Sequence, residues 1–135
     1  MYTSKVKVFF YDADPAGIIF FSNIFRFAHS VYEEFMRTLN TEKNFFIDRD
    51  FLLPIIHAEA DYLKSIKPGD ELKVELIVTQ LKKSSFELSY NMYNTNSELA
   101  AKVKTVHVCR GKKEFKKIDM PEDLYKKLSA NMQQV

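Results

Sequence analysis

The feature that most constrains the fold is a long helical repeat of apolar residues in the first third of the chain. The apolar side chains recur every three or four residues, at Ile24, Phe27, Ala28, Val31, Tyr32, Phe35, Met36 and Leu39. This spacing places them on one face of an α-helix, whose first amides Ser22 or Asn23 can cap. A helix with one apolar face must pack against another layer, which the rest of the chain has to supply.

Much of the remaining sequence alternates between apolar and polar residues, which is the period of a β-strand. The alternation is clearest over residues 72–79 and 86–93, and residues 99–110 predict a further strand. The other expected elements are strands within residues 5–11 and 52–63, a short edge at 115–118, and a closing helix over 122–132 with Pro121 as its first helical residue. One long helix followed by consecutive antiparallel strands predicts an α+β fold whose sheet wraps around the helix.

Composition narrows the class of protein. The 135 residues, 46% of them hydrophobic, favour a single domain spanning residues 1–135. The 20 basic and 18 acidic residues give a net charge of +2, which is too even to indicate a nucleic-acid-binding protein. The single cysteine, Cys109, forms no internal disulfide, and the sequence contains no signal-peptide pattern and no apolar run of ~18 residues. We therefore expect a cytoplasmic protein with no membrane span.

The first candidate site is the segment Asp12-x-Asp14-Pro15-x-Gly17, which lies just before the long helix. The N-terminus of a helix exposes free amides and partial positive charge, which suits a developing oxyanion. A nearby carboxylate can attack an acyl carbonyl or activate water. The two Asp residues, spaced by one, point to opposite sides of an extended segment, so we expect one to act and the other to hold the turn. The alternative is a loop with two solvated acids.

The second candidate site is the segment Lys82-Lys83-Ser84, at the junction of two expected strands. Lysine ammonium groups and a serine hydroxyl can bind phosphate, although a basic pair at a hairpin is more often simply solvated. The three histidines are far apart in the sequence and have no spacing typical of zinc ligands, so no metal site is expected.

The segment from Phe10 to Asn23, with its Asp-x-Asp-x-x-Gly motif and following apolar run, resembles the start of the hotdog-fold acyl-CoA thioesterases. The likeness is greatest to the 4-hydroxybenzoyl-CoA thioesterase class. It extends over roughly residues 5–110 and includes the segments Pro54-Ile55-Ile56 with Tyr62, Pro68-Gly69-Asp70, and Lys82 to Phe86. The resemblance implies a hotdog fold, an antiparallel sheet around one central helix, which agrees with the periodicity.

The resemblance also implies roles for individual residues. It places the catalytic carboxylate on Asp14, as nucleophile or as general base, and it implies that backbone amides around Phe20 and Phe21 polarise the thioester carbonyl. Gly17 allows the close turn into the helix. The resemblance also assigns the binding of the coenzyme A phosphates to Lys82, Lys83 and Ser84. Two positions depart from the 4-hydroxybenzoyl enzyme, because Ser84 replaces a Lys and Phe21 replaces a Tyr.

Within the family, the patterns Phe21-x-Asn23 and His29-x-x-Tyr32-Glu33 look most like 1,4-dihydroxy-2-naphthoyl-CoA hydrolases. The resemblance implies an aromatic or other hydrophobic acyl-CoA as substrate, no cofactor beyond the substrate's own coenzyme A, and a homo-oligomer, either dimer or homotetramer. The alternatives are a short-chain thioesterase of the Tol–Pal-associated type and a non-catalytic acyl-CoA-binding module. A hydratase on this fold needs a His beside its acid, and Asp14 is followed by Pro-Ala-Gly.

Overall fold

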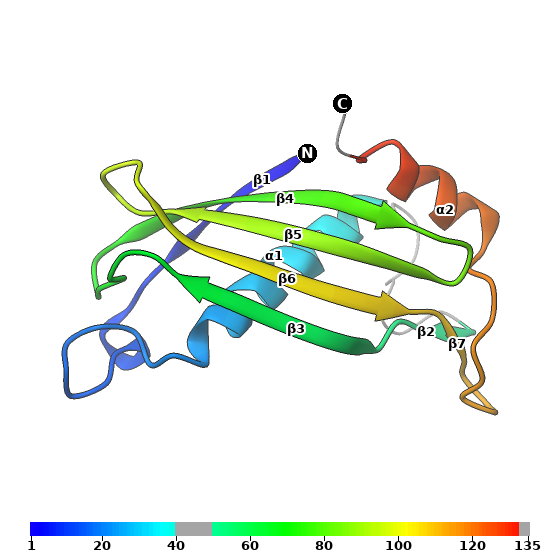
Figure 1. Ribbon diagram of the computed structural model, residues 1–135, viewed down its shortest axis with the longest axis horizontal. Coiled ribbons are helices and arrows are strands. Elements are labelled where there is room, and N and C mark those ends of the chain that lie inside the picture. The colour runs from blue at the N-terminus through cyan, green and yellow to red at the C-terminus, as the bar shows by residue number, and fades with distance from the viewer. Residues whose placement is uncertain (40–49, 133–135) are drawn as a thin grey trace.

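A five-stranded antiparallel sheet with one long helix across it forms the body of the molecule (Figure 1). The computed structural model describes residues 1–39 and 50–132. In chain order the elements are β1 (Tyr2–Lys7), the 3-10 turn η1 (Phe10–Asp12), α1 (Asn23–Leu39), β2 (Phe51–Leu52), β3 (Ile55–Tyr62), β4 (Glu71–Leu81), β5 (Ser85–Tyr93), β6 (Leu99–Val108), β7 (Arg110–Gly111) and α2 (Glu122–Ser129). The sheet has the order β1-β4-β5-β6-β3, and β2 pairs separately with β7.

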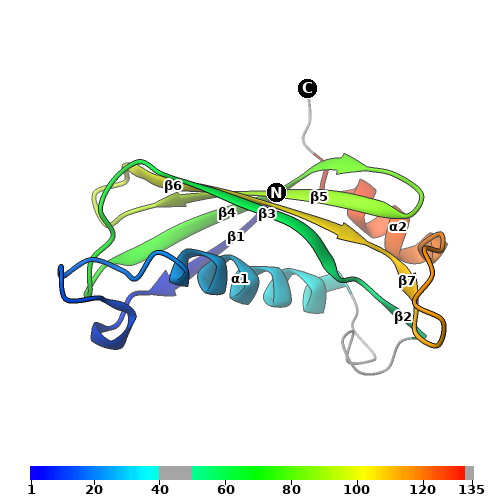
Figure 2. The ribbon, with the colours of Figure 1, turned by 60° about the horizontal axis from the view of Figure 1, so that its bottom comes forward.

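Helix α1 packs against one face of the sheet, as its apolar repeat predicts. All eight positions of the repeat are buried, and the helix runs beneath the curved sheet in Figure 2. The sheet contributes the alternate residues of its long strands, namely Leu72, Val74, Leu76, Val78, Phe86, Leu88, Tyr90 and Met92. The core therefore lies between α1 and the sheet, which confirms the predicted α+β architecture.

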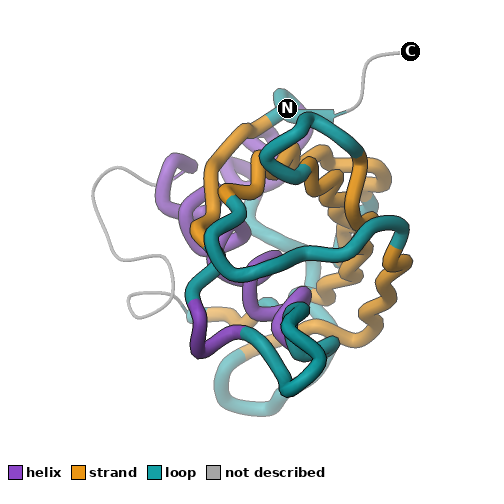
Figure 3. The backbone as a smooth tube through the Cα atoms, turned by 90° about the vertical axis from the view of Figure 1, so that its left-hand side faces the viewer, coloured by secondary structure: helices purple, strands orange, loops and turns teal. Residues whose placement is uncertain are grey.

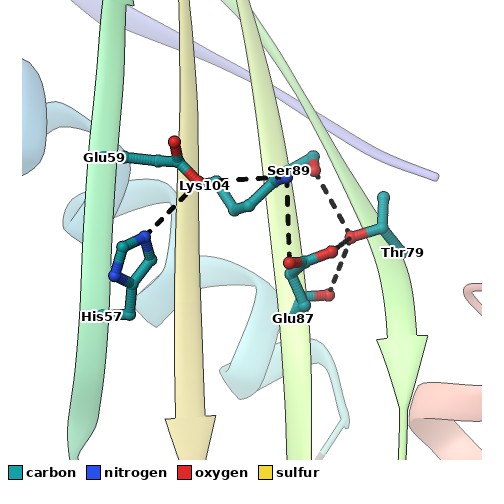
Figure 4. Close-up of polar contacts among 6 residues, drawn as sticks. All are labelled: His57, Glu59, Thr79, Glu87, Ser89 and Lys104. Carbon is teal, nitrogen blue, oxygen red and sulfur yellow. Dashed lines mark hydrogen bonds and ion pairs between the residues drawn. The ribbon is translucent and has the colours of Figure 1, made fainter.

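The opposite face of the sheet is polar. In Figure 4 the Lys104 ammonium group lies between two carboxylates, 3.9 Å from that of Glu59 and 3.8 Å from that of Glu87. The Thr79 hydroxyl donates to Glu87 at 2.7 Å, so these contacts connect β3, β6, β5 and β4. A hollow of about 310 Å³ on this face is lined in part by these paired side chains, among them Glu59, Thr79 and Lys104. Charges that satisfy one another in this way explain why no second layer covers this face in the described part of the chain.

The expected strand over residues 5–11 is wrong at both ends. Strand β1 pairs with β4 from Tyr2 opposite Leu76 to Lys7 opposite Glu71, and it ends there because β4 begins at Glu71. The chain then forms η1, where Phe10 is 88% exposed. The aromatic run that follows β1 is therefore outside the sheet.

Other boundaries also differ from those expected. The strand expected within 52–63 is divided at Pro54, whose carbonyl accepts a hydrogen bond from the Val108 amide. The strand expected over 99–110 is likewise divided into β6 and β7. Only a single bridge, between Lys117 and Arg110, forms where an edge at 115–118 was expected. Pro121 is the N-cap residue of α2, not its first helical residue, and α2 ends at Ser129.

Candidate functional site

The loop that connects η1 to α1 lies at the end of the sheet where β4 begins. Figure 3 faces this end of the molecule, where loops gather in front of the strands. The Ile19 amide of the loop donates a backbone hydrogen bond to the Ile66 carbonyl, and the segment before η1 is held by a bond from the Val8 amide to the Asp70 carbonyl. The Asp12–Gly17 motif therefore sits on a fixed base beside the N-terminus of α1.

Asp12 is the acid that holds the turn. Its side chain is buried, with the residue only 1% exposed, and its Oδ2 accepts the Phe9 amide at 2.9 Å. Its Oδ1 forms an ion pair with the Arg26 guanidinium on α1. Its carbonyl accepts a further bond from the Asn23 side-chain amide at 2.9 Å, so Asn23 ties the loop to the helix. Asp12 thus has its hydrogen-bonding capacity used within the chain, as expected for a structural acid.

Asp14 is partly exposed on the far side of the same segment. Its Oδ1 accepts the Ala16 amide at 2.8 Å, and its Oδ2 has no partner among residues 1–39 and 50–132. Gly17 has a φ of +80°, which an L side chain adopts only at a cost, and its amide donates to the Asp14 carbonyl at 3.0 Å. Asp14 and Gly17 line an open pocket of about 640 Å³ together with Phe10 and Pro68. One carboxylate oxygen is therefore free to act at a pocket rim.

The two backbone amides expected to polarise a carbonyl differ in their surroundings. The Phe20 amide already donates to the Asp12 carbonyl at 2.8 Å. The Phe21 amide has no acceptor within the described ranges of the chain, and it lies two residues before the first residue of α1. Phe21 itself is 65% exposed. Of this pair, only Phe21 presents an N–H that can donate to a ligand.

Tyr62, at the end of β3, holds the backbone at Phe21 in place. Its hydroxyl donates to the Phe21 carbonyl, and partial burial raises the pKa of this phenol, so it is protonated and able to donate at neutral pH. Tyr62 and Phe21 also line a second, apolar pocket of about 360 Å³ with Ile18, Ile19, Leu63 and Ile66. This hydrogen bond could not be predicted from the sequence, because it joins residues 41 positions apart.

We expect Tyr62→Phe to lower kcat for thioester hydrolysis about tenfold with little change in KM. The phenyl ring keeps the packing but no longer holds the Phe21 backbone in place. A displaced backbone donor should lower kcat by less than the ~10²–10³-fold loss that follows from deleting such a donor. Steady-state kinetics measure the effect. Tyr125→Phe on α2, which also removes one phenol, is the matched control, and an unchanged kcat in Tyr62→Phe would show that the contact does not position the site.

The structure does not bring Lys82, Lys83 and Ser84 to Asp14. They form the turn between β4 and β5, at the opposite end of β4 from Pro68, as Figure 1 shows. Strand β4 has 11 residues and is therefore about 35 Å long. Both lysines are exposed, whereas the Ser84 hydroxyl donates to the Asp119 carboxylate at 2.9 Å.

The histidines lie apart from the Asp14 loop. His29 pairs with Glu33 at 3.4 Å on the surface of α1, and His57 contacts Glu59 on the outer face of the sheet. His107 is fully buried in the core. Within residues 1–39 and 50–132, no three His, Cys, Asp or Glu side chains are grouped so that they could hold a metal ion. No helix in those ranges is long and apolar enough to cross a membrane.

Comparison with known families agrees with this arrangement. A family model described as the thioesterase-like superfamily matches residues 8–128, nearly the whole chain. This chain is a member of the thioesterase-like superfamily. The match includes the Asp14 loop, α1 and every strand of the main sheet except β1.

The thioesterase-like relatives include enzymes named for one substrate. A 1,4-dihydroxy-2-naphthoyl-CoA hydrolase from Thermosynechococcus vestitus is 32% identical over 118 residues, covering 87% of this chain and 81% of the relative. Another, from Synechococcus elongatus, is 34% identical over 117 residues and covers 85% of each chain. The crystal structure of a 1,4-dihydroxy-2-naphthoyl-CoA thioesterase from Synechocystis has a TM-score of 0.86 at 28% identity, over 95% of both chains. These similarities confirm the predicted family and the hotdog fold.

Proposed function

We propose that this protein hydrolyses the thioester of an aromatic acyl-CoA, with 1,4-dihydroxy-2-naphthoyl-CoA as the favoured substrate. The observation that carries the proposal is the free Asp14 carboxylate oxygen at a pocket rim, in the same loop as the Phe21 backbone amide, which has no acceptor in the described structure. The names of the relatives support the same substrate.

In the proposed reaction the thioester carbonyl accepts a hydrogen bond from the Phe21 amide beside the N-terminus of α1. This donor and the partial positive charge of the helix end stabilise the oxyanion that forms at the carbonyl. Asp14 either attacks the carbonyl carbon itself, giving a mixed anhydride that water then hydrolyses to restore the carboxylate, or takes a proton from an attacking water. The C–S bond breaks, the sulfur leaves as the coenzyme A thiolate and is protonated, and water supplies the oxygen of the free acid. This chemistry needs no cofactor besides the coenzyme A of the substrate.

A second copy of the chain completes the proposed site. The pantetheine arm of coenzyme A has about thirteen bonds between sulfur and pyrophosphate, comparable to four extended residues or about 15 Å. An arm of that length does not reach from Asp14 to Lys82 along the 11 residues of β4. One chain therefore cannot place its own Asp14 on the thioester and its own Lys82 and Lys83 on the phosphates.

The free edge of β3 supports pairing of two copies. This strand is at the edge of the sheet, and seven of its eight residues are exposed, among them Ile55, Ile56 and Tyr62. A long exposed edge strand with apolar residues favours pairing with another strand. Phe21 and Leu63 extend the exposed apolar surface next to its Tyr62 end.

When β3 pairs antiparallel with β3 of a second copy, each end of one sheet lies beside the opposite end of the other sheet. The Tyr62 end lies by the Asp14 loop, and the Ile55 end pairs with His107 near the end of β6. A two-fold axis therefore brings the Asp14 loop of one copy toward the end of the other copy that carries Lys82 and Lys83. We propose a homodimer of this kind, which can pair again into a homotetramer. Light scattering tests it, because a mass equal to the 15.8 kDa of one chain would exclude the arrangement.

We expect aryl-CoA thioesters to be hydrolysed at least tenfold faster, in kcat/KM, than acetyl- or butyryl-CoA. Exposed apolar side chains, including Ile18 and Phe21, surround the Asp14 loop and can bury a flat bicyclic acyl group. An extra ~80 Å² of buried apolar area contributes about 2 kcal/mol at ~25 cal/mol per Å², or some 30-fold. Release of free coenzyme A, followed with a thiol reagent, measures each rate.

The same assay separates the alternatives. Equal or faster hydrolysis of the short chains would favour a short-chain thioesterase. No release of thiol from any acyl-CoA, together with measurable acyl-CoA binding, would favour a non-catalytic binding module. We also propose a cytoplasmic location, supported by the free and buried Cys109 thiol, since free thiols are maintained in reducing compartments.

A further inference from the structure

Strand β6 buries two polar side chains in the core between the sheet and α1. Thr105 is 5% exposed and His107 is fully buried, and the His107 ring lies between the Tyr32 ring of α1 and the Phe86 ring of β5. Burying a polar group in an apolar core costs free energy unless the group is hydrogen-bonded. The partners of these two side chains therefore indicate what they do there.

The two side chains belong to a line of hydrogen bonds that ends on the backbone at Leu53. The His107 Nδ1 lies 3.4 Å from the Leu53 carbonyl oxygen, which can only accept, so Nδ1 carries the proton. Burial lowers the pKa of His107 to about 4, so at pH 7 the ring is neutral and its Nε2 accepts from the Thr105 hydroxyl at 2.9 Å. The Tyr90 hydroxyl, whose pKa is raised by burial, donates to the Thr105 oxygen at 3.2 Å. Every donor in the line points toward Leu53.

The segment 53–56 bends between β2 and β3. Ile55 pairs with His107, but Ile56 has no partner in the register of β3 and β6, which makes this a β-bulge. Bulges change the direction of the side chains around them. Here Ile55 is 42% exposed and Ile56 is 56% exposed. His107 thus holds, through the Leu53 carbonyl, a bend that presents two apolar side chains at the free edge of the sheet.

The proposed dimer brings this bend to the reaction site of the other copy. Antiparallel pairing over the eight residues of β3 sets Ile55 of the second copy opposite Tyr62, whose hydroxyl holds the Phe21 backbone. The Phe21 amide is the proposed donor to the thioester carbonyl. In that arrangement the acyl group attached to this carbonyl lies beside Ile55 and Ile56 of the second copy, whose side chains suit the face of an aromatic ring.

We propose that His107 is a positioning residue for the acyl site of a second copy, because it fixes the bend that sets Ile55 and Ile56 against the aromatic acyl group. This inference rests on the proposed function and on the proposed dimer. It gives the buried hydrogen bonds of β6 a part in the choice of substrate, in addition to their part in the stability of the core.

Two amide side chains in place of the imidazole separate this role from packing. His107→Asn places its NH₂ group near the position of Nδ1, where it can still donate to the Leu53 carbonyl. His107→Gln places its amide near the position of Nε2, beside Thr105, and leaves the Leu53 carbonyl without that donor. Both variants lose the stacked ring, so they differ chiefly in the contact with Leu53.

The readout is the ratio of kcat/KM for naphthoyl-CoA to kcat/KM for acetyl-CoA, which has no ring to contact the two isoleucines. We expect this ratio to fall about tenfold in His107→Gln, mainly through a raised KM for naphthoyl-CoA, and to stay close to the wild-type ratio in His107→Asn. A tenfold change corresponds to the loss of roughly 55 Å² of apolar contact.

An unchanged ratio in His107→Gln would overturn the inference, because a merely structural residue lowers the rates for both substrates by the same factor. Equal falls of the ratio in the two variants would overturn it as well, since they would reflect the missing ring. Urea unfolding checks that each variant is folded. If His107→Gln does not fold, His107→Leu replaces it with the same expected result, because leucine fills the core and also removes the donor. The wild-type ratio by itself tests the proposed function, so the two failures are distinguished.

Mixed dimers test whether His107 acts on the site of the other copy. Co-expression of His107→Gln chains with Asp14→Asn chains, each carrying a different affinity tag, gives dimers with one chain of each kind. Their one site with an intact Asp14 has the native His107 on the facing chain, so we expect the wild-type ratio. A ratio as low as that of the His107→Gln protein would mean that His107 acts on the Asp14 of its own chain, and it would overturn the inference.

Discussion

Replacing Asp14 with Asn is expected to lower kcat at least ~10²-fold, the loss typical of removing a general base, and further if Asp14 is a nucleophile. The amide is neither base nor effective nucleophile at neutral pH. The fold should persist, because the only hydrogen bond that the Asp14 side chain makes in the described structure is accepted from the Ala16 amide, which an Asn side-chain oxygen accepts equally well. Single-turnover and steady-state hydrolysis of an aryl-CoA measure the loss.

Asp12→Asn provides the matched comparison. It removes the charge opposite Arg26 at a buried position, so we expect a less stable protein with a smaller loss of kcat. Near-native turnover by Asp14→Asn, or a larger loss of kcat in Asp12→Asn measured on folded protein, would contradict the assignment of the catalytic carboxylate to Asp14.

The second large effect expected is a loss of stability in acid, caused by His107. Its ring is fully buried, stacked between Tyr32 and Phe86, with its Nε2 2.9 Å from the Thr105 hydroxyl. Burial lowers the pKa of His107 from 6.5 to about 4. The unfolded chain therefore binds a proton at this residue between pH 6.5 and pH 4, where the folded chain does not.

The direction in which stability changes with pH follows from this difference in proton binding. The stability contributed by the neutral ring is complete above pH 6.5, and it decreases as the pH falls toward 4, by about 3 kcal/mol in total. Urea unfolding at pH 7 and pH 4 measures the loss. Other groups also titrate in this range, so the comparison is with His107→Asn, which should be less stable at pH 7 but should lose about 3 kcal/mol less on acidification. His57→Gln, at an exposed position, should behave like the wild type.

The elements predicted correctly are those whose signal is local. The repeat of α1 and the alternation of β4 and β5 arise from side chains a few residues apart, and both elements appear where expected. The end of β1 depends instead on where its partner β4 begins, which the aromatic residues after Lys7 do not reveal. Pro54 divides the strand expected within 52–63 because proline has no backbone N–H to donate, whereas the partner of its carbonyl, the Val108 amide, is a long-range contact.

The environment of the candidate residues was predicted in part for the same reason. The loop around Asp14 could be identified because its motif is contiguous, and Asp12 is buried while Asp14 is partly exposed, as the expected alternation predicts. The catalytic role of Asp14 stays a prediction. The occupied Phe20 amide, the hydroxyl of Tyr62 and the distance from Asp14 to Lys82 depend on the tertiary fold.

The placement of Asp14 and the lysines at opposite ends of β4 affects how activity scales with protein concentration. In the proposed homodimer a single chain contributes halves to two different sites, so association would create both sites together and dissociation would remove both. Specific activity should therefore fall when the protein is diluted below the dissociation constant of the dimer. If coenzyme A bridges two copies as proposed, its binding is linked to their association, and saturating ligand should shift that threshold to lower concentrations of protein.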